Sequence, residues 1–292
     1  MRVLLIGGSG QVGQALLDCK PDAVECIAPH SAELNLENRQ QVRQWIAHTR
    51  PHLIINAAAY TAVDNAECEP ERAFQINAAA VAALAAAAAE ANARLFQLST
   101  DYVFDGNAEA PYPETAACHP LSVYGASKLA GEQAVLELGR AGLVMRTSWV
   151  FSSHGSNFVK TMLRLGAERK ELGVVDDQIG GPTPAGAIAT ALWQLADHEN
   201  ACGIYHLSGT PSCSWYTFAG QIFADATACR LLPQSPALSP ITSAQFPTAA
   251  RRPGWSVLDC SKLKLECGIT QPDWRPALRA MIEELASQQA VE

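Results

Sequence analysis

Tyr124 and Lys128 stand four positions apart in the sequence Tyr-Gly-Ala-Ser-Lys, within residues 122–138 that carry a helical pattern. Residues four apart on a helix lie on the same face. A free tyrosine has a pKa of about 10 and is a poor acid or base at neutral pH. A nearby ammonium group favours the phenolate and lowers that pKa. We therefore expect this pair to exchange a proton with a carbonyl or alcohol oxygen.

A hydroxyl group is placed to assist this pair. The segment Ser99-Thr100-Asp101-Tyr102 directly follows the apolar run Arg94–Leu98, which we predict to be a strand. Ligands of open parallel sheets bind beyond the carboxyl ends of the strands. The sequence therefore predicts that Thr100 hydrogen-bonds a substrate oxygen.

The chain opens with a pattern that is typical of dinucleotide binding. The apolar run Arg2–Ile6 ends in Gly7-Gly8-Ser9-Gly10-Gln11-Val12-Gly13, where Gly7 or Gly8 can begin the glycine spacing. Glycines permit a tight turn, let the backbone approach a pyrophosphate, and allow close packing of helix on strand. The N-terminus of the following helix adds a partial positive charge toward the phosphates.

The residues after the second predicted strand leave the choice between NADPH and NADH open. An acidic residue about 20 positions beyond the glycines would bind a ribose 2′-hydroxyl. The strand instead ends in Ala28-Pro29-His30-Ser31, and Glu33 lies past it. No arginine or lysine stands there to mark a 2′-phosphate site. We expect NADPH, with NADH as the alternative.

The framework that must bring these residues together alternates strands and helices up to Arg146, which indicates βαβ units and a doubly wound parallel sheet. Beyond that point, five prolines between Leu231 and Gly254 exclude a continuous helix or a central strand. We predict a Rossmann-type domain over 1–150 and a smaller α/β, mainly substrate-binding domain over 151–292, with some segments returning to the first. The predicted strands are Arg2–Ile6, Ala23–Ala28, Leu53–Ile55, Arg94–Leu98, Leu143–Arg146 and Gly203–Leu207, and the predicted helices are Val12–Leu17, Glu37–His48, Glu69–Glu90, Ser122–Leu138, Phe158–Arg169 and Pro184–Leu195.

Together, the glycine turn, Asn56-Ala57-Ala58-Ala59, Thr100 and the Tyr124–Lys128 pair resemble the extended short-chain dehydrogenase/reductase family. Longer segments are similar to the members of that family that reduce dTDP-linked 4-keto-6-deoxy sugars. They are residues 10–13, 56–67, 99–104, 124–132, 146–151, 177–178, 182–183 and 250–253.

This resemblance implies that NAD(P)H reduces the C4 ketone of dTDP-4-dehydro-L-rhamnose. Tyr124 would donate the proton, Lys128 would bind the nicotinamide ribose, and Thr100 would orient the carbonyl. The cofactor site would consist of Gly7, Gly10, Gln11, Val12, Gly13, Asn35, Ala57, Ala58, Ala59, Tyr60, Tyr124 and Lys128. The dTDP-sugar would contact Thr100, Asp101, Tyr102, Trp149, Asn157 and one of Arg251 and Arg252.

Other activities remain open to different degrees. Nucleotide-sugar dehydratases of this superfamily carry Thr-Asp-Glu, whereas this chain has Thr100-Asp101-Tyr102, which disfavours elimination. A related 4-ketoreductase or epimerase and a non-catalytic, NADP-binding regulatory subunit are the alternatives. Trp149 has core packing as its alternative role, and Asn77 is either the holder of a proton-relay water or a plain polar helix residue.

Composition narrows the class of protein. Of the 292 residues, 48% are hydrophobic and 17% charged, which indicates a folded core. The net charge of −8 disfavours a nucleic-acid partner. Nine scattered cysteines without a CxxC pair suggest reduced thiols. The longest apolar run, 78–89, is too short to span a bilayer. We expect a soluble cytoplasmic monomer or homodimer with no membrane partner.

No metal is predicted. The seven histidines fall at no metal-ligand spacing. Some members of the family hold magnesium between subunits through glutamates, one of them in the first helix. This chain has Gln14-Ala15-Leu16 there.

Overall fold

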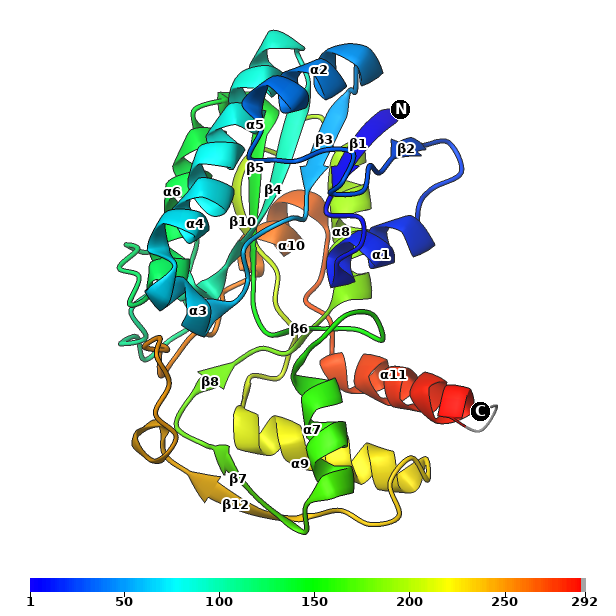
Figure 1. The fold of residues 1–292 in the computed structure, drawn as a ribbon, viewed down its shortest axis with the longest axis vertical. Coiled ribbons are helices and arrows are strands. Elements are labelled where there is room, and N and C mark those ends of the chain that lie inside the picture. The colour runs from blue at the N-terminus through cyan, green and yellow to red at the C-terminus, as the bar shows by residue number, and fades with distance from the viewer. Residues whose placement is uncertain (290–292) are drawn as a thin grey trace.

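A six-stranded parallel sheet in the order β10-β5-β4-β3-β1-β2 forms the centre of the upper lobe in Figure 1. The computed structural model describes residues 1–289. The strands are β1 (Arg2–Ile6), β2 (Glu25–Ile27), β3 (Leu53–Asn56), β4 (Arg94–Thr100), β5 (Gly142–Thr147) and β10 (Gly203–His206). Because β2 and β3 pair with opposite sides of β1, the direction of winding reverses between β1 and β3. Ligands of such sheets bind at that reversal.

Helices cover both faces of the sheet (Figure 1). One face carries α1 (Gln11–Asp18), α8 (Ala185–Asp197) and α10 (Ser261–Cys267), and the other carries α2 (Arg39–Thr49), α5 (Ala80–Glu90) and α6 (Val123–Leu136). Alternate residues of β1 divide between two cores: Val3 and Leu5 pack with α1 and α8, whereas Leu4 packs with α2 and α5. The predicted doubly wound α/β fold is confirmed.

The smaller lobe lies beyond the carboxyl ends of the strands and has its own core. It contains α7 (Phe158–Glu168), α9 (Trp215–Ala228), α11 (Trp274–Gln289) and the parallel pair β7 (Glu171–Val175) and β12 (Ala237–Ile241). The sequence did not predict α9, α11, β7 or β12. Pro240 lies within β12, and this strand pairs with β7 alone, so the missing N–H of proline is tolerated.

The second half of the chain contributes to both lobes. β10 pairs with β5 at the edge of the large sheet, and α8 packs on α1. Two short strand pairs also form: β6 (Val150–Phe151) with β9 (Thr183–Pro184), and β8 (Ile179–Gly180) with β11 (Cys213–Ser214), whose Cys213 belongs to the core of the smaller lobe. The assignment of substrate binding to the smaller lobe stays a prediction.

The predicted helix Glu69–Glu90 is interrupted. α3 (Val63–Cys68) precedes α4 (Pro70–Phe74), and a π-helical turn at Gln75–Ala79 connects α4 to α5. Within residues 1–289, Pro70–Glu90 is the one helical segment long and apolar enough to cross a membrane by length and composition. It packs against α2 and α6, and its Val81 and Leu84 are buried in the core of the sheet lobe.

Candidate active site

A cleft of about 820 Å³ opens at the carboxyl ends of β1, β3, β4 and β5, between the two lobes. It runs from the glycine turn to the start of α9. Its lining includes Gly7, Gly10, Gln11, Val12, Asn35, Ala57, Ala58, Ala59, Thr100, Asp101, Tyr102, Tyr124, Lys128, Trp149 and Trp215. The fold therefore brings most of the predicted site residues to one cavity.

The glycine turn at one end of the cleft requires glycine for steric reasons. Gly7 has a φ of +82°, and a Cβ on it would lie 2.6 Å from the backbone nitrogen of Ala58. A Cβ on Gly13 would lie 2.0 Å from the carbonyl oxygen of Gly7. No side chain within residues 1–289 caps the N-terminus of α1, so its first N–H groups remain available. This is a cradle that fits a dinucleotide pyrophosphate.

The segment after β3 forms the wall beside this cradle. Asn56 is buried, and its Nδ2 donates a hydrogen bond of 2.7 Å to Oε1 of Gln97 on β4. Its Oδ1 accepts one of 3.1 Å from the backbone N–H of Ala58. These bonds hold the backbone of residues 57–59 along the cleft.

Tyr60 does not line the cleft as the resemblance implies. Its hydroxyl donates a hydrogen bond of 2.7 Å to Glu69, which raises the pKa of Tyr60. Its backbone N–H and carbonyl pair with the buried amide of Asn77, at 2.8 and 3.1 Å. Asn77 Nδ2 also donates to Oγ of Ser127 on α6. Asn77 thus connects the π-helical turn to the loop around Tyr60 and to α6. Thr61, the next residue of that loop, lines the cleft.

Lys128 projects from α6 under the cleft. The helix begins after Ser122, whose side chain accepts a hydrogen bond from the backbone N–H of Gly125. Lys128 is 5% exposed, and its Nζ donates a hydrogen bond of 2.6 Å to the carbonyl oxygen of Leu98 on β4. Burial lowers the pKa of Lys128 to about 8, while the carboxylate of Glu132 acts in the opposite direction.

Burial decides the pKa of Tyr124. It raises this pKa to about 12, and the Asp101 carboxylate also raises it, whereas a hydrogen bond with Thr100 lowers it. The prediction that Lys128 lowers the tyrosine pKa below its ordinary value is therefore wrong for this structure. The loss of solvation outweighs any effect of the ammonium group. Tyr124 is protonated at neutral pH, which suits a proton donor.

Thr100 and Asp101 lie beside Tyr124 at the end of β4. The Thr100 hydroxyl donates a hydrogen bond of 3.1 Å to Oδ1 of Asp101 and accepts one of 3.2 Å from the backbone N–H of Tyr102. The ring of Tyr102 meets that of Tyr124 edge-on, with 5.9 Å between centroids. This arrangement places two hydroxyl groups, from Thr100 and Tyr124, together at the cleft.

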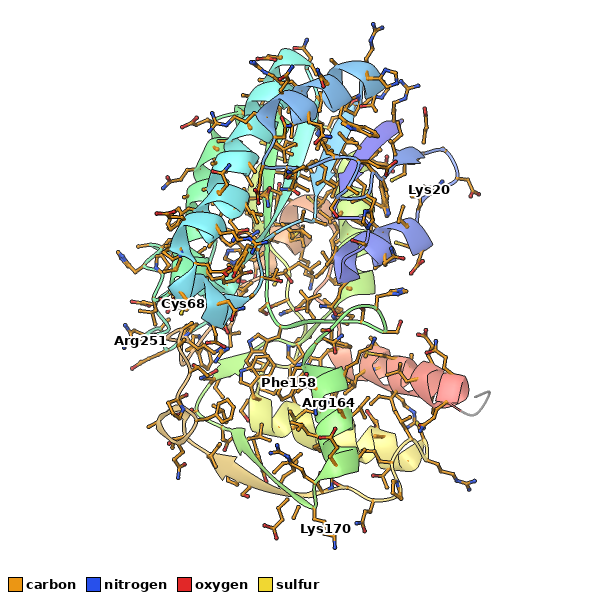
Figure 2. All side chains as sticks on the ribbon, in the orientation of Figure 1. Lys20, Cys68, Phe158, Arg164, Lys170 and Arg251 are labelled. Atoms are coloured by element: carbon orange, nitrogen blue, oxygen red, sulfur yellow. The ribbon has the colours of Figure 1, made fainter. Side chains whose placement is uncertain are left out.

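An aromatic pair forms the opposite wall. Trp149 stacks on Trp215, with ring centroids 3.4 Å apart and planes 7° apart. Phe158, which is labelled in Figure 2 at the start of α7, packs against Trp215. Trp149 has a φ of +47°, and its indole fills the space where a side chain on Gly180 would stand. Sequence reasoning missed Trp215, because α9 itself was not predicted. The signal available was Ser214, whose side chain caps that helix.

Asn157 stands behind the cleft wall. Its Oδ1 caps α7, and its Nδ2 donates to Oε1 of Gln11 at 2.9 Å and to the carbonyl of Ser152 at 2.7 Å. Gln11 itself lines the cleft at the start of α1. These hydrogen bonds hold Gln11 and the loop before α7, and the nucleotide contact of Asn157 stays a prediction.

The two adjacent arginines are separated by the fold. Arg252 donates a hydrogen bond of 2.8 Å to Asp64 and lies beside the Tyr102 hydroxyl, whose pKa it lowers against the larger effect of burial. Arg251 is exposed and lies at the outer edge of the molecule in Figure 2. Arg252 therefore lies beside Tyr102, a residue of the cleft lining, and its contact with a ligand stays a prediction.

Few charges line the cleft. Among its lining residues within 1–289, Lys128 is the only cation. Asn35 lines the end of the cleft toward β2, near Glu37. In the described part of the chain, no group of three or more His, Cys, Asp and Glu residues is arranged to hold a metal ion. All nine cysteines are free.

Known proteins resemble this chain over both lobes. Residues 1–287 match the family described as RmlD substrate binding domain. A protein of Aggregatibacter actinomycetemcomitans named dTDP-4-dehydrorhamnose reductase is 45% identical over 95% of this chain and 97% of its own length. The chain belongs to the dTDP-4-dehydrorhamnose reductase family. The family match includes the smaller lobe that carries Trp215.

Solved structures of the same family share the fold. A dTDP-4-dehydrorhamnose reductase from Clostridium acetobutylicum superposes with a TM-score of 0.91 at 38% identity, over 98% of this chain and 99% of that one. The enzyme from Bacillus anthracis, solved in complex with NADP, superposes with a TM-score of 0.90 at 40% identity, over 97% of this chain and 99% of that one. A member of the dTDP-4-dehydrorhamnose reductase family with this architecture thus binds NADP.

Proposed function

We propose that this chain reduces the C4 ketone of dTDP-4-dehydro-L-rhamnose to the alcohol of dTDP-L-rhamnose with NADPH, NADH being the alternative. The observation that carries the proposal is the convergence of Thr100, Tyr124 and Lys128 at the end of β4, in the cleft that begins at the glycine turn. The relatives with the same name and fold support the sugar substrate.

The cofactor fits the end of the cleft beside β1. The backbone around Gly7 and Gly13 leaves no room for side chains, and the uncapped start of α1 offers N–H groups to a pyrophosphate. Lys128 lies in the same cleft, where its ammonium group would bind the ribose next to the nicotinamide. When bound, NADPH supplies the hydride for C4.

Tyr124 supplies the proton to the oxygen at C4. The raised pKa of Tyr124, about 12, keeps its proton in place until negative charge develops on that oxygen. The Thr100 hydroxyl, at hydrogen-bonding distance from the phenol, orients the same oxygen. Lys128 stays near because its bond to the Leu98 carbonyl ties α6 to β4. A hydrogen-bond donor that points at the oxygen on which negative charge develops lowers the activation barrier of the reduction.

The sugar and its nucleotide occupy the part of the cleft between the lobes. Asp101, Tyr102 and Trp149 border the reacting end, and Trp215 offers an aromatic face beside Trp149. Arg252 supplies positive charge toward the diphosphate, while Asn157 acts indirectly through Gln11. We place the enzyme in the cytoplasm, as a monomer or homodimer.

Cofactor oxidation tests the proposal directly. Purified protein is incubated with NADPH and dTDP-4-dehydro-L-rhamnose, absorbance of NADPH is followed, and the product is identified by NMR. Formation of dTDP-L-rhamnose supports the reductase. Absence of turnover together with a stoichiometric partner protein would favour the regulatory subunit, and a product of inverted configuration without net NADPH oxidation would favour the epimerase.

A further inference from the structure

We propose that Asp101 is a positioning residue whose proton directs the Thr100 hydroxyl toward the substrate ketone, so that the neutral acid is the form active in reduction. This inference rests on the proposed function and deepens it. The two residues are adjacent in sequence at the end of β4, and both line the cleft.

Asp101 is a carboxyl group in unusual surroundings. It is 2% exposed, and its Oδ2 has no hydrogen-bond partner among residues 1–289, whereas its Oδ1 accepts from Thr100. Ionisation of a carboxyl group whose Oδ2 is buried without a hydrogen bond costs free energy, because that oxygen has lost its water and gained no donor from the protein. A neutral acid reduces that cost.

The Thr100 hydroxyl has a single proton to distribute. A threonine hydroxyl donates once and accepts twice. One acceptor position is used by the backbone N–H of Tyr102 at 3.2 Å. Asp101 and Tyr124 both lie within hydrogen-bond reach of the same hydroxyl. The charge on Asp101 therefore decides where the proton points.

The protonation of Asp101 therefore selects between two hydrogen-bond arrangements of the Thr100 hydroxyl. When Asp101 is ionised, it can only accept, so the Thr100 proton points to the carboxylate and away from the substrate oxygen. When Asp101 is protonated, its O–H donates to Thr100, both acceptor positions of the hydroxyl are filled, and the Thr100 proton points into the cleft. Only the second state gives the ketone oxygen a donor from Thr100 in addition to Tyr124.

The surroundings of Asp101 bring its neutral and ionised forms into balance near neutral pH. Tyr102 and Tyr124 face it as neutral phenols, Ser256 and Thr100 face it as hydroxyls, and Arg252 lies beyond the Tyr102 hydroxyl. Burial raises the pKa of Asp101 to about 7, against the smaller, opposite effect of the two hydroxyls and of the backbone N–H groups of Asp101 and Tyr102.

The pH dependence of kcat/KM for dTDP-4-dehydro-L-rhamnose, at saturating NADPH, tests the inference between pH 6 and pH 8. For the wild type we expect a decline of roughly tenfold per pH unit above about pH 7, because only neutral Asp101 supports reduction. Asp101→Asn carries an amide NH2 that can donate to Thr100 and no carboxyl group that titrates, so its kcat/KM, whatever its absolute value, should vary by less than about twofold between pH 6 and pH 8. Persistence of the wild-type decline in this variant would overturn the inference.

Two further variants distinguish a role of Asp101 in positioning Thr100 from a role in stabilising the fold alone. Thr100→Ala should also lose the decline, since Asp101 acts through that hydroxyl; a retained decline contradicts the mechanism. Asp225→Asn is the matched control, because Asp225 on α9 is also buried with an Oδ2 unpartnered among the described residues. It lies away from the cleft and should leave the pH profile unchanged.

A substrate-free measurement keeps this inference distinguishable from the proposed function. If the wild type gives no turnover at any pH, the proposed function fails. The protonation of Asp101 can still be titrated by NMR of protein labelled at the aspartate carboxyl carbons, with the Asp101 signal assigned from its absence in Asp101→Asn. A titration midpoint near 7 that rises in Thr100→Ala supports the inference. A midpoint near 4 overturns it.

Discussion

Nζ of Lys128 donates a hydrogen bond of 2.6 Å to the carbonyl oxygen of Leu98, and so joins α6 to the carboxyl end of β4. Thr100 follows two residues after Leu98, and Tyr124 stands one helical turn before Lys128 on α6. This bond therefore sets the spacing between the two hydroxyl groups of the candidate site. It also confines a charged group to a nearly dry environment.

The buried ammonium group predicts a pH-dependent stability. The pKa of Lys128 is about 8 in the folded protein, below its ordinary value of 10.5, so the unfolded state binds more protons between these values. The free energy of unfolding contributed by this group thus increases as pH rises from about 8 to 10.5. Compared with Lys128→Met in denaturant titrations, the wild type should gain about 3 kcal/mol over this range. A constant difference between the two proteins would contradict this.

Removal of the phenolic hydroxyl should stop the proton transfer but leave the cleft intact. Tyr124→Phe is expected to lower kcat by roughly 10²–10⁴, the contribution of a positioned acid. Binding of NADPH, followed by fluorescence titration, should stay within about twofold of the wild type. Tyr216→Phe on α9 is a matched control outside the cleft lining. Near-normal turnover by Tyr124→Phe would remove this residue from the mechanism.

The glycine turn is expected to tolerate no side chain at position 13. A methyl group in Gly13→Ala would stand 2.0 Å from the Gly7 carbonyl oxygen, so the turn must open and the affinity for NADPH should fall at least tenfold. Gly220→Ala is the control, because a Cβ on Gly220 meets nothing within 4 Å inside α9. That substitution should stabilise the protein by about 0.5–1 kcal/mol in thermal unfolding. Equal cofactor affinities in both variants would refute the steric argument.

The aromatic pair should affect substrate and cofactor differently. Trp215→Ala removes one face of the stack with Trp149, in the part of the cleft wall that belongs to the smaller lobe. We expect KM for the dTDP-sugar to rise roughly tenfold, as stacking on an aromatic face contributes about 1–3 kcal/mol, while the affinity for NADPH is unchanged. Phe246→Ala, which removes an exposed aromatic ring, serves as the control. A weakened NADPH affinity in Trp215→Ala would place the indole in the cofactor site instead.

The two adjacent arginines provide a matched comparison. Arg252→Ala should raise KM for the dTDP-sugar by roughly 10-fold or more, because Arg252 lies beside Tyr102 and is oriented by Asp64. Arg251→Ala removes the same charge from an exposed position and should change KM by less than about twofold. If both substitutions raise KM equally, the effect is one of overall charge rather than of contact.

Most of the sheet lobe could be predicted from local pattern. Apolar runs such as Arg2–Ile6 and Arg94–Leu98 became β1 and β4, because residues buried on both faces of a parallel sheet leave a continuous hydrophobic signal. The elements of the smaller lobe were harder to predict from the sequence. The helix α9 has a buried core of Phe218 and Phe223 that is completed only by α7 and α11, so its sequence alone did not indicate it.

By itself, the sequence determined the order of the βα units, the glycine turn and the residue types Thr100, Tyr124 and Lys128, because these depend on neighbours a few positions away. Only the tertiary structure decided that Tyr60 turns from the cleft, that Trp215 enters it, and that the pKa of Tyr124 is raised. The physical reason is that burial and the electrostatic surroundings of a group are sums over segments far apart in the chain.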